Sequence, residues 1–281
     1  MQNYIIGIDG GGSKTHAVIL DSRYTFIDEI VGGPANINSD LTLAYTSIHT
    51  TITTLLTKHN LQGNNVAIGI GVAGYSNIKA RIELLNLLTN DYRNINLNSD
   101  CHIACLAAHS GHNGSIVICG TGIAGYSIQN NIGNQIGGWG FPQGDLGGAA
   151  WLGLEICRYT GKAIDGSIDW SNLLKAIFSK FSNDTQVFKQ WLLKATASDF
   201  ASIARLLIDS PSTDAHAQNI FNNAIMEVTS FIQAVKKHNP DLAIKIVGGL
   251  ATTYLPSLKQ TFPDLELSTH PPAYGACLLS M

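Results

Sequence analysis

Three consecutive glycines near the N-terminus are followed by two hydroxyl residues and a lysine, in the run Gly10-Gly11-Gly12-Ser13-Lys14-Thr15. Consecutive glycines free the backbone for positive φ and let its N–H groups approach a ligand closely. Such N–H groups form an anion-binding concavity, to which Ser13 and Lys14 add donors. Asp9 ends the apolar segment before the turn, where its carboxylate suits Mg²⁺, an ion that takes oxygen ligands. The pattern predicts phosphate binding; the alternative is an ordinary hairpin turn with a buried Asp9 and a solvated Lys14.

A second segment repeats this arrangement in the middle of the chain. The apolar residues 115–119 lead into Gly120-Thr121-Gly122, and a second apolar segment follows at 125–129. The repeat predicts two halves, each opened by a strand, a glycine turn and a strand. Two such turns facing each other would clamp a polyphosphate. As with Ser13, the alternative role for the Thr121 hydroxyl is to stabilise its own turn.

Asp100 lies between the two glycine turns. It follows a short apolar segment at 95–98 and precedes the helical segment 101–108. Phosphoryl transfer to a hydroxyl needs a carboxylate that takes the hydroxyl proton, and Asp100 is the candidate for this general base. The alternative role is that of a helix N-cap, which Asp also favours.

Two further glycine-rich segments follow. Residues 133–148 are too polar for a core element and carry one tryptophan, Trp139, and one acid, Asp145. We expect this segment to be a loop, with Trp139 in a cleft rather than in the core. Gly248-Gly249 stands between the apolar segment 244–247 and a helix, so a ligand could approach the backbone closely there. The alternative is an ordinary strand–helix turn.

The elements that must position these residues follow from periodicity. The first part of the chain reads as three strands followed by alternating helices and strands, and the later part is mostly helical. Strands are expected at 5–9, 15–21, 26–31, 66–72, 95–98, 115–119, 125–129, 244–247 and 265–267. Helices are expected at 41–56, 78–88, 101–108, 151–159, 170–178, 186–193, 198–207, 214–237, after 249 and from 273.

The composition favours a binder of neutral small molecules. The chain has 281 residues, of which 45% are hydrophobic and 13% charged, against roughly 25% charged in a typical soluble domain. The net charge of −3 gives no footprint for nucleic acid, and no apolar run reaches the roughly 20 residues that span a membrane. The five cysteines have no zinc spacing. They are expected to be reduced and mostly buried, in a cytoplasmic protein without a signal peptide.

In their order along the chain, these segments resemble the actin-like ATPase and sugar kinase superfamily, and within it the N-acetylglucosamine kinase branch, the BadF/BadG/BcrA/BcrD ATPase family. The resemblance covers nearly the whole chain. It is carried by Gly7–Thr15, Asn98-Ser99-Asp100, Ile118–Gly122, Gly137–Gly140 with Gly144-Asp145, and Val247–Leu250. It implies an α/β fold of two ribonuclease-H-like domains with an interdomain cleft. The first domain would be 1–113 plus 271–281, and the second 114–270 with a helical insertion.

The resemblance also implies ATP and Mg²⁺ as cofactors and assigns roles to individual residues. Nucleotide contacts are implied for Asp9, Gly11, Gly12, Ser13, Lys14, Thr121, Gly122, Gly248 and Gly249. Sugar contacts are implied for Asn36, Asp100, Gly138, Trp139 and Asp145. Asp9 would hold Mg²⁺ through water, because this ion dehydrates reluctantly. No nucleic acid or membrane partner is expected, and a homodimer is one option for the assembly.

The activity implied is an ATP-dependent kinase acting on the 6-hydroxyl of N-acetylglucosamine or glucosamine. Two departures leave the amino substituent open: Ile123 replaces a serine that follows Gly-Thr-Gly in related kinases, and Leu146-Gly147-Gly148 replaces Glu-Gly-Ser. One alternative is a related acceptor such as N-acetylmuramate. Another is a dehydratase-activator ATPase with an iron–sulfur cluster on Cys119 and Cys157, which the apolar strand around Cys119 disfavours. The last alternative is a non-catalytic sugar sensor, which the presence of the candidate catalytic residue Asp100 disfavours.

Overall fold

The computed structural model describes residues 4–209 and 213–280. Its contacts divide the chain into two compact units. Unit 1 contains Met1–Gly114, Ser127–Asn134 and Ser268–Met281, and unit 2 contains Ser115–Tyr126 and Gln135–Leu267. Within the described residues, no helix combines the length and apolar character needed to span a membrane.

A mixed five-stranded sheet forms the centre of unit 1, with strand order β3-β2-β1-β4-β5. Its strands are β1 (Tyr4–Gly10), β2 (Thr15–Asp21), β3 (Phe26–Gly32), β4 (Val66–Val72) and β5 (Ile95–Ser99). The first three form an antiparallel meander, whereas β4 and β5 run parallel to β1. The carboxyl ends of β1, β4 and β5 therefore lie at the same edge of the sheet, and that edge carries Asp9 and Asp100.

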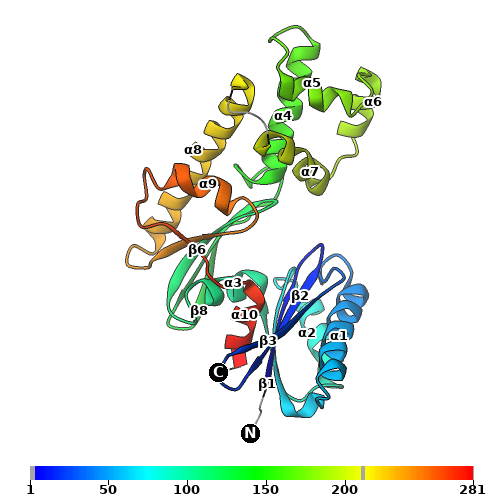
Figure 1. The fold of residues 1–281 in the computed structure, drawn as a ribbon, viewed down its shortest axis with the longest axis vertical. Coiled ribbons are helices and arrows are strands. Elements are labelled where there is room, and N and C mark those ends of the chain that lie inside the picture. Colours follow the sequence, from blue (N-terminus) through cyan, green and yellow to red (C-terminus); the bar gives the residue numbers. More distant parts are fainter. Residues whose placement is uncertain (1–3, 210–212, 281) are drawn as a thin grey trace. The chain divides into compact units, whose positions relative to one another are not determined.

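Helices cover both faces of this sheet (Figure 1). They are α1 (Leu41–Lys58), α2 (Ile78–Thr89), α3 (Asp100–Ala108) and α10 (Pro272–Cys277), with short 3₁₀ turns η1 (Gly63–Asn65) and η2 (Leu278–Ser280). Helices α1 and α2 pack on the face lined by Ile6 and Ile8. Helix α10 packs on the opposite face against Ile5. It approaches so closely that a Cβ on Gly7 would lie 2.0 Å from the Ala273 carbonyl, which explains a glycine inside β1.

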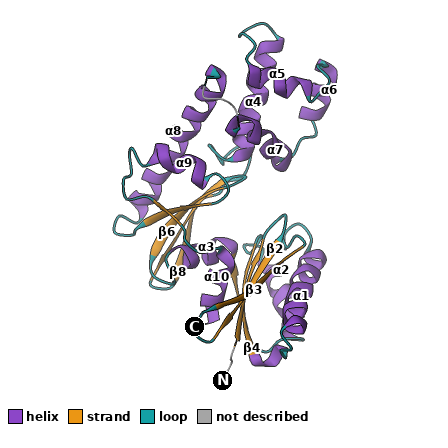
Figure 2. Ribbon diagram, viewed as in Figure 1, coloured by secondary structure: helices purple, strands orange, loops and turns teal. Residues whose placement is uncertain are grey.

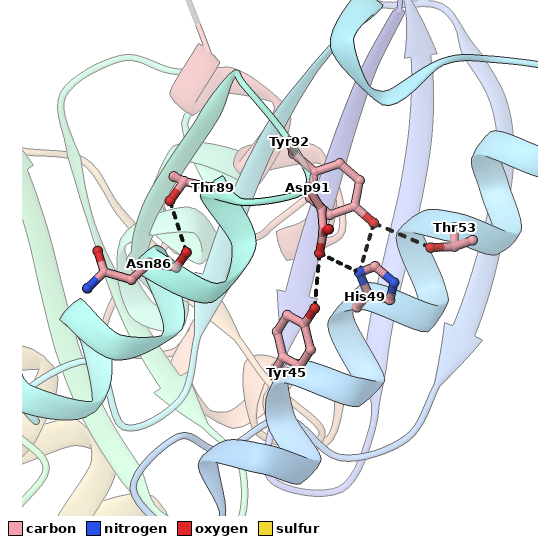
Figure 3. A network of polar contacts seen from close by, with 7 residues as sticks. All are labelled: Tyr45, His49, Thr53, Asn86, Thr89, Asp91 and Tyr92. Carbon is pink, nitrogen blue, oxygen red and sulfur yellow. Dashed lines mark hydrogen bonds and ion pairs between the residues drawn. The ribbon is translucent and has the colours of Figure 1, made fainter.

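A polar network joins α1 to the residues that follow α2 (Figure 3). The Tyr45 hydroxyl donates to Asp91 at 3.0 Å, and His49 Nδ1 lies 3.4 Å from the same carboxylate. Tyr92 places its hydroxyl 3.2 Å from His49 Nδ1 and 3.3 Å from the Thr53 hydroxyl. The network ties together two helices that cover the same face of the sheet.

Unit 2 contains most of a second five-stranded sheet, in the order β10-β9-β6-β7-β8, and a large helical part (Figure 2). The segment Ser127–Asn134, which includes the end of β7 and the start of β8, is grouped with unit 1. The strands are β6 (Gly114–Cys119), β7 (Ile123–Gln129), β8 (Ile132–Gly137), β9 (Ile244–Val247) and β10 (Glu266–Leu267). The helices are α4 (Ala149–Ile164), α5 (Asn172–Ser179), α6 (Thr185–Leu192), α7 (Ala197–Ile208), α8 (Ala215–His238) and α9 (Ala251–Leu258). Side chains of all six helices enter the core of this unit.

Helix starts in unit 2 follow the capping chemistry of the sequence. Asp184 caps α6 and Asp214 caps α8, each accepting two backbone N–H groups. Thr196 and Asp199 form a reciprocal capping box at the start of α7, which satisfies two donors that would otherwise be unpaired. The helix expected at 214–237 is confirmed as α8, and its buried stripe contains Ile220, Ala224, Val228, Ile232 and Val235.

One expectation and one alternative from the sequence are wrong. The segment 133–148 is not loop throughout, since β8 covers Ile132–Gly137. This strand is an edge strand whose first residues are exposed, so it carries no apolar alternation to read. Asp100 is not the N-cap of α3, because the Ser99 hydroxyl accepts the capping hydrogen bond from the His102 N–H.

Candidate active site

The first glycine turn is a tight hairpin between β1 and β2. The Gly11 N–H donates to the Lys14 carbonyl at 2.9 Å, and the next ladder pair is Gly10 with Thr15. Ser13 and Lys14 are exposed, and a Cβ on Gly12 would meet nothing within 4 Å. The three glycines are not among the residues with positive φ, so that part of the expectation is wrong. A glycine at position 10 is favoured for a steric reason, because a Cβ there would lie 3.1 Å from the Cβ of Ala35.

Backbone hydrogen bonds fix this turn to two neighbouring loops. The Ala73 N–H donates to the Gly10 carbonyl and the Ala35 N–H to the Gly11 carbonyl, both at 2.8 Å. Asn36 forms an isolated bridge with Ala73, so the end of β4 and the Asn36 loop lie beside the turn. The Asn36 side-chain oxygen accepts from the backbone N–H groups of Asn38 and Ser39. The group that Asn36 can offer to a ligand is therefore its side-chain amide NH₂.

Asp100 lies close enough to Asp9 at this edge to influence the ionisation of Asp9. Burial raises the pKa of Asp9 to about 6, and the negative charge of Asp100 adds to the rise, while His16 and Lys14 oppose it. The Asp100 carboxylate accepts a hydrogen bond from the Cys101 N–H at 2.8 Å. It stands in the first turn of α3, where the helix dipole favours a negative charge. Since Ser99 caps the helix, Asp100 is not needed for that purpose.

His16 is a neighbour of Asp9 that sequence reasoning missed. It lies directly opposite Asp9 in the β1–β2 ladder, and its Nε2 atom is 2.8 Å from Glu29 on β3. Residues opposite each other in an antiparallel pair place their side chains on the same face. Counting back from the turn would therefore have paired His16 with Asp9.

The second glycine turn rests on the N-terminus of α4. The Ala149 N–H donates to the Gly120 carbonyl at 2.9 Å, and the Ala150 N–H to the Thr121 carbonyl at 3.0 Å. Thr121 itself is exposed at the tip. Gly148, just before α4, must be a glycine, because a Cβ there would lie 2.8 Å from the Thr121 carbonyl. The turn and the start of α4 thus form one packed unit.

Asp145 packs directly on the second turn. Its carboxylate accepts a hydrogen bond from the Ile123 N–H at 3.3 Å, and a Cβ on Gly122 would lie 2.3 Å from that carboxylate. The backbone of Asp145 has a positive φ of 61°, and burial raises the pKa of its side chain. Gly138, Trp139 and Asp145 line one cavity of about 430 Å³. Trp139 is 86% exposed, so it is not a core residue.

The turn at Gly248 also lies against the strand that leads into the second glycine turn. Gly248 has a φ of +100°, and a Cβ there would lie 2.4 Å from the Cys119 carbonyl. The Leu250 N–H donates to that same carbonyl at 2.9 Å. Gly249 faces open space. Unit 2 therefore brings together the Thr121 turn, the Asp145 loop and the Gly248 turn.

Each unit gathers its own share of the predicted residues. Unit 1 groups Asp9, the 11–14 turn, Asn36 and Asp100 at the carboxyl edge of its sheet. Among the described residues, no group of three or more His, Cys, Asp or Glu side chains is arranged to hold a metal ion. The cysteines are all free thiols, and four of them are buried, as expected.

Residues 6–280 match the BadF/BadG/BcrA/BcrD ATPase family. The chain belongs to this family. This membership confirms the resemblance on which the assignment of the glycine turns was based.

Three known proteins are similar over most of the chain. The glucosamine kinase GspK of Vibrio cholerae is 29% identical over 218 residues, covering 76% of this chain and 72% of its own. The N-acetyl-D-glucosamine kinase of Dictyostelium discoideum is 24% identical, and the match covers 98% of this chain and 97% of that protein. A crystal structure from Chromobacterium violaceum, described as that of a candidate N-acetylglucosamine kinase, superposes with a TM-score of 0.90 at 27% identity and covers 99% of both chains. The expected α/β fold class is confirmed.

Proposed function

We propose that the protein is an ATP-dependent hexosamine kinase that phosphorylates the 6-hydroxyl of glucosamine or N-acetylglucosamine. Family membership and the two similar kinases support transfer of phosphate to a sugar. The observation that carries the proposal is the contact between the Asp145 loop and the second glycine turn. Through this contact, a loop whose aromatic side chain and carboxylate suit a sugar lies next to a turn whose backbone suits a phosphate.

In this proposal the nucleotide is held mainly by backbone. Gly12 is exposed and allows close approach to the backbone beside Gly11, and Ser13, Lys14 and Thr121 add exposed donors at the two turns. Gly122 completes the second turn. Gly249 borders open space just before α9, and Gly248 packs against the Cys119 carbonyl beside it; the nucleoside would approach the backbone at Gly249. Each unit thus carries one glycine turn suited to phosphate.

The sugar would be held by Asn36, Gly138, Trp139 and Asp145, with Asp100 at its reacting hydroxyl. Asp100 would accept the proton of the 6-hydroxyl as that oxygen attacks the terminal phosphorus of ATP. Its carboxylate is held by the Cys101 N–H, which restricts its orientation. A neighbouring carboxylate, Asp9, raises the local negative charge.

Asp9 fits the role of a magnesium site. Its carboxylate is half-buried, and burial and Asp100 both disfavour its charge, so a divalent cation bound through water would offset this repulsion. When bound, Mg²⁺ would neutralise charge on the β- and γ-phosphates. The other partners follow from composition: we propose a cytoplasmic protein without nucleic acid or membrane partners, and light scattering would decide whether it forms a homodimer.

Two alternatives keep the same fold. An N-acetylmuramate kinase would need room for the lactyl ether beside the 3-hydroxyl. A dehydratase activator would need exposed thiolates for its cluster, but Cys119 and Cys157 are 0% and 3% exposed. Burial also raises the pKa of both thiols to about 12, which disfavours the thiolate form. The structure therefore gives no support to the second alternative.

A coupled assay of ADP release tests the proposal. It would compare glucosamine, N-acetylglucosamine, N-acetylmuramate, N-acetylmannosamine and glucose at equal concentration, with ATP and Mg²⁺. We expect the first two sugars to give the highest kcat/KM, and the signal to disappear when Mg²⁺ is chelated. ADP release that is unaffected by every sugar would contradict the proposal.

A further inference from the structure

The cavity of about 430 Å³ in unit 2 has a wall that the sequence analysis did not foresee. One side is formed by the loop residues Gly138, Trp139 and Asp145. Helix α8 also lines the cavity, through Glu227, Ser230, Phe231 and Ala234. A cavity of this size lies within the range of small-molecule sites. All of its lining residues belong to unit 2, so the site is complete within that unit.

The four α8 residues form one stripe of the helix. They are spaced three, four and seven residues from Glu227, and residues at these spacings lie on one face of an α-helix. Phe231 holds this face close to the loop, because a Cβ on Gly137 would lie 2.7 Å from its ring. Gly147 is equally close to Val228 on the core side of α8. The position of Glu227 at the cavity is therefore fixed by packing on both sides.

The charges around this cavity are all negative. Asp145 and Glu227 are its only ionisable lining residues, and no lysine, arginine or histidine lines it. Among the described residues, Glu227 takes part in none of the ion pairs. Two aromatic residues, Trp139 and Phe231, also line the cavity, and aromatic faces attract cations. Both features favour a ligand with a positive charge.

We propose that Glu227 is a specificity-determining residue that selects an amino sugar with a free, protonated amine over its N-acetylated form. The inference rests on the proposed function, because it assumes that the Asp145 loop holds the sugar. A protonated amine would donate charge-assisted hydrogen bonds to the Glu227 carboxylate. An acetamido group carries no charge and gains nothing from this carboxylate. Ile123, which also lines the cavity, adds apolar contact only.

The experiment measures KM and kcat for glucosamine and N-acetylglucosamine with the wild type and Glu227→Gln. The assays are run at about pH 6.5, where an amine with a pKa of roughly 7.7–8.0 is protonated. We expect the wild type to prefer glucosamine. KM for glucosamine should be about 3–10-fold higher in Glu227→Gln, because the variant loses one charge-assisted hydrogen bond at an exposed position. KM for N-acetylglucosamine should change less than about 2-fold.

Glu83→Gln provides the matched control, since it removes the same charge from an exposed position on α2 in unit 1. It should leave both KM values unchanged. Glu227→Lys should lower the glucosamine preference further. An unchanged ratio of the two kcat/KM values in Glu227→Gln, or a wild type that prefers N-acetylglucosamine, overturns the inference while the kinase assignment stands. Failure of both sugars in the wild type overturns the proposed function itself.

Discussion

The Tyr254 hydroxyl donates a hydrogen bond to the Gly147 carbonyl at 2.7 Å. Tyr254 lies on α9, is fully buried and packs edge-on against Phe221 of α8. Gly147 has a φ of +86° and follows Asp145 by two residues. The helix that begins after the Gly248 turn therefore holds the loop that carries Asp145. The helix after the Gly248 turn and the Asp145 loop of unit 2 are connected through one buried phenol.

Tyr254→Phe should loosen this loop without removing packing. The Gly147 carbonyl would lose a buried donor, which costs about 1–3 kcal/mol of unfolding free energy. We expect KM for the preferred sugar to rise about threefold or more, with a smaller change in kcat. Urea unfolding followed by tryptophan fluorescence measures the first effect, and steady-state kinetics the second.

Tyr45→Phe is the control for this variant. It removes a hydroxyl that donates to Asp91 at 3.0 Å in the network of Figure 3, within unit 1. It should change stability only slightly, because the bond is exposed, and leave the sugar KM unchanged. A Tyr254→Phe variant that loses stability but keeps its sugar KM would show that the loop is positioned by other contacts.

Asp100→Asn tests the proposed role of Asp100 as the general base. The amide preserves the size of the side chain but cannot take a proton, so kcat should fall about 10²–10⁴-fold. Folding should be unaffected, since Ser99 and not Asp100 caps α3. Asp40→Asn is a matched control, because Asp40 caps α1 and Asn is an equally good cap. Near-normal turnover by Asp100→Asn would remove the assignment.

The elements that could be predicted from the sequence are those whose burial repeats along the chain. Strand β9 was expected at Ile244–Val247 and lies there, and α8 was visible from its apolar stripe. Strand β8 could not be recognised, because its exposed edge position removes the alternation that marks a half-buried strand. Polar and glycine residues at 133–137 read as loop for the same reason.

For the candidate site, local turns were predictable and long-range contacts were not. The two glycine turns and the Gly248 turn follow from residue types within a few positions. The contact of Gly122 with Asp145, and the position of Glu227 at the cavity, depend on how α8 and the loop pack in three dimensions. No pattern along the chain encodes these contacts. The contact of His16 with Asp9 is of an intermediate kind, because it crosses two strands but follows from the register of a single hairpin.

Asp9 should make the ligand-free protein less stable as the pH rises. Folding raises the pKa of this carboxyl from 3.8 to about 6, so the folded state holds its proton more tightly than the unfolded chain. The stabilisation is complete below pH 3.8 and is lost as the pH rises through about 6. Asp9→Asn carries no charge, so its Tm relative to the wild type should increase between about pH 5 and about pH 7.

The control for this pH dependence is Asp21→Asn. Backbone N–H groups of Thr25 and Arg23 lower the pKa of the exposed Asp21 carboxyl, so it stays ionised in both states over this pH range. The Tm difference between Asp21→Asn and the wild type should be the same at both pH values. A constant difference for Asp9→Asn as well would mean that the Asp9 pKa is not raised.

Gly122→Ala should displace Asp145 from the second turn. The new Cβ would lie 2.3 Å from the Asp145 carboxylate, so the side chain and its hydrogen bond from the Ile123 N–H must shift. Misplacement by about 1 Å costs up to roughly a hundredfold in activity, and we expect KM for the sugar to rise at least about tenfold. Gly161→Ala on α4, where a Cβ meets nothing within 4 Å, should keep normal kinetics and gain about 0.5–1 kcal/mol of stability. If Gly122→Ala retains the wild-type sugar KM, then Asp145 does not contact the sugar from this position.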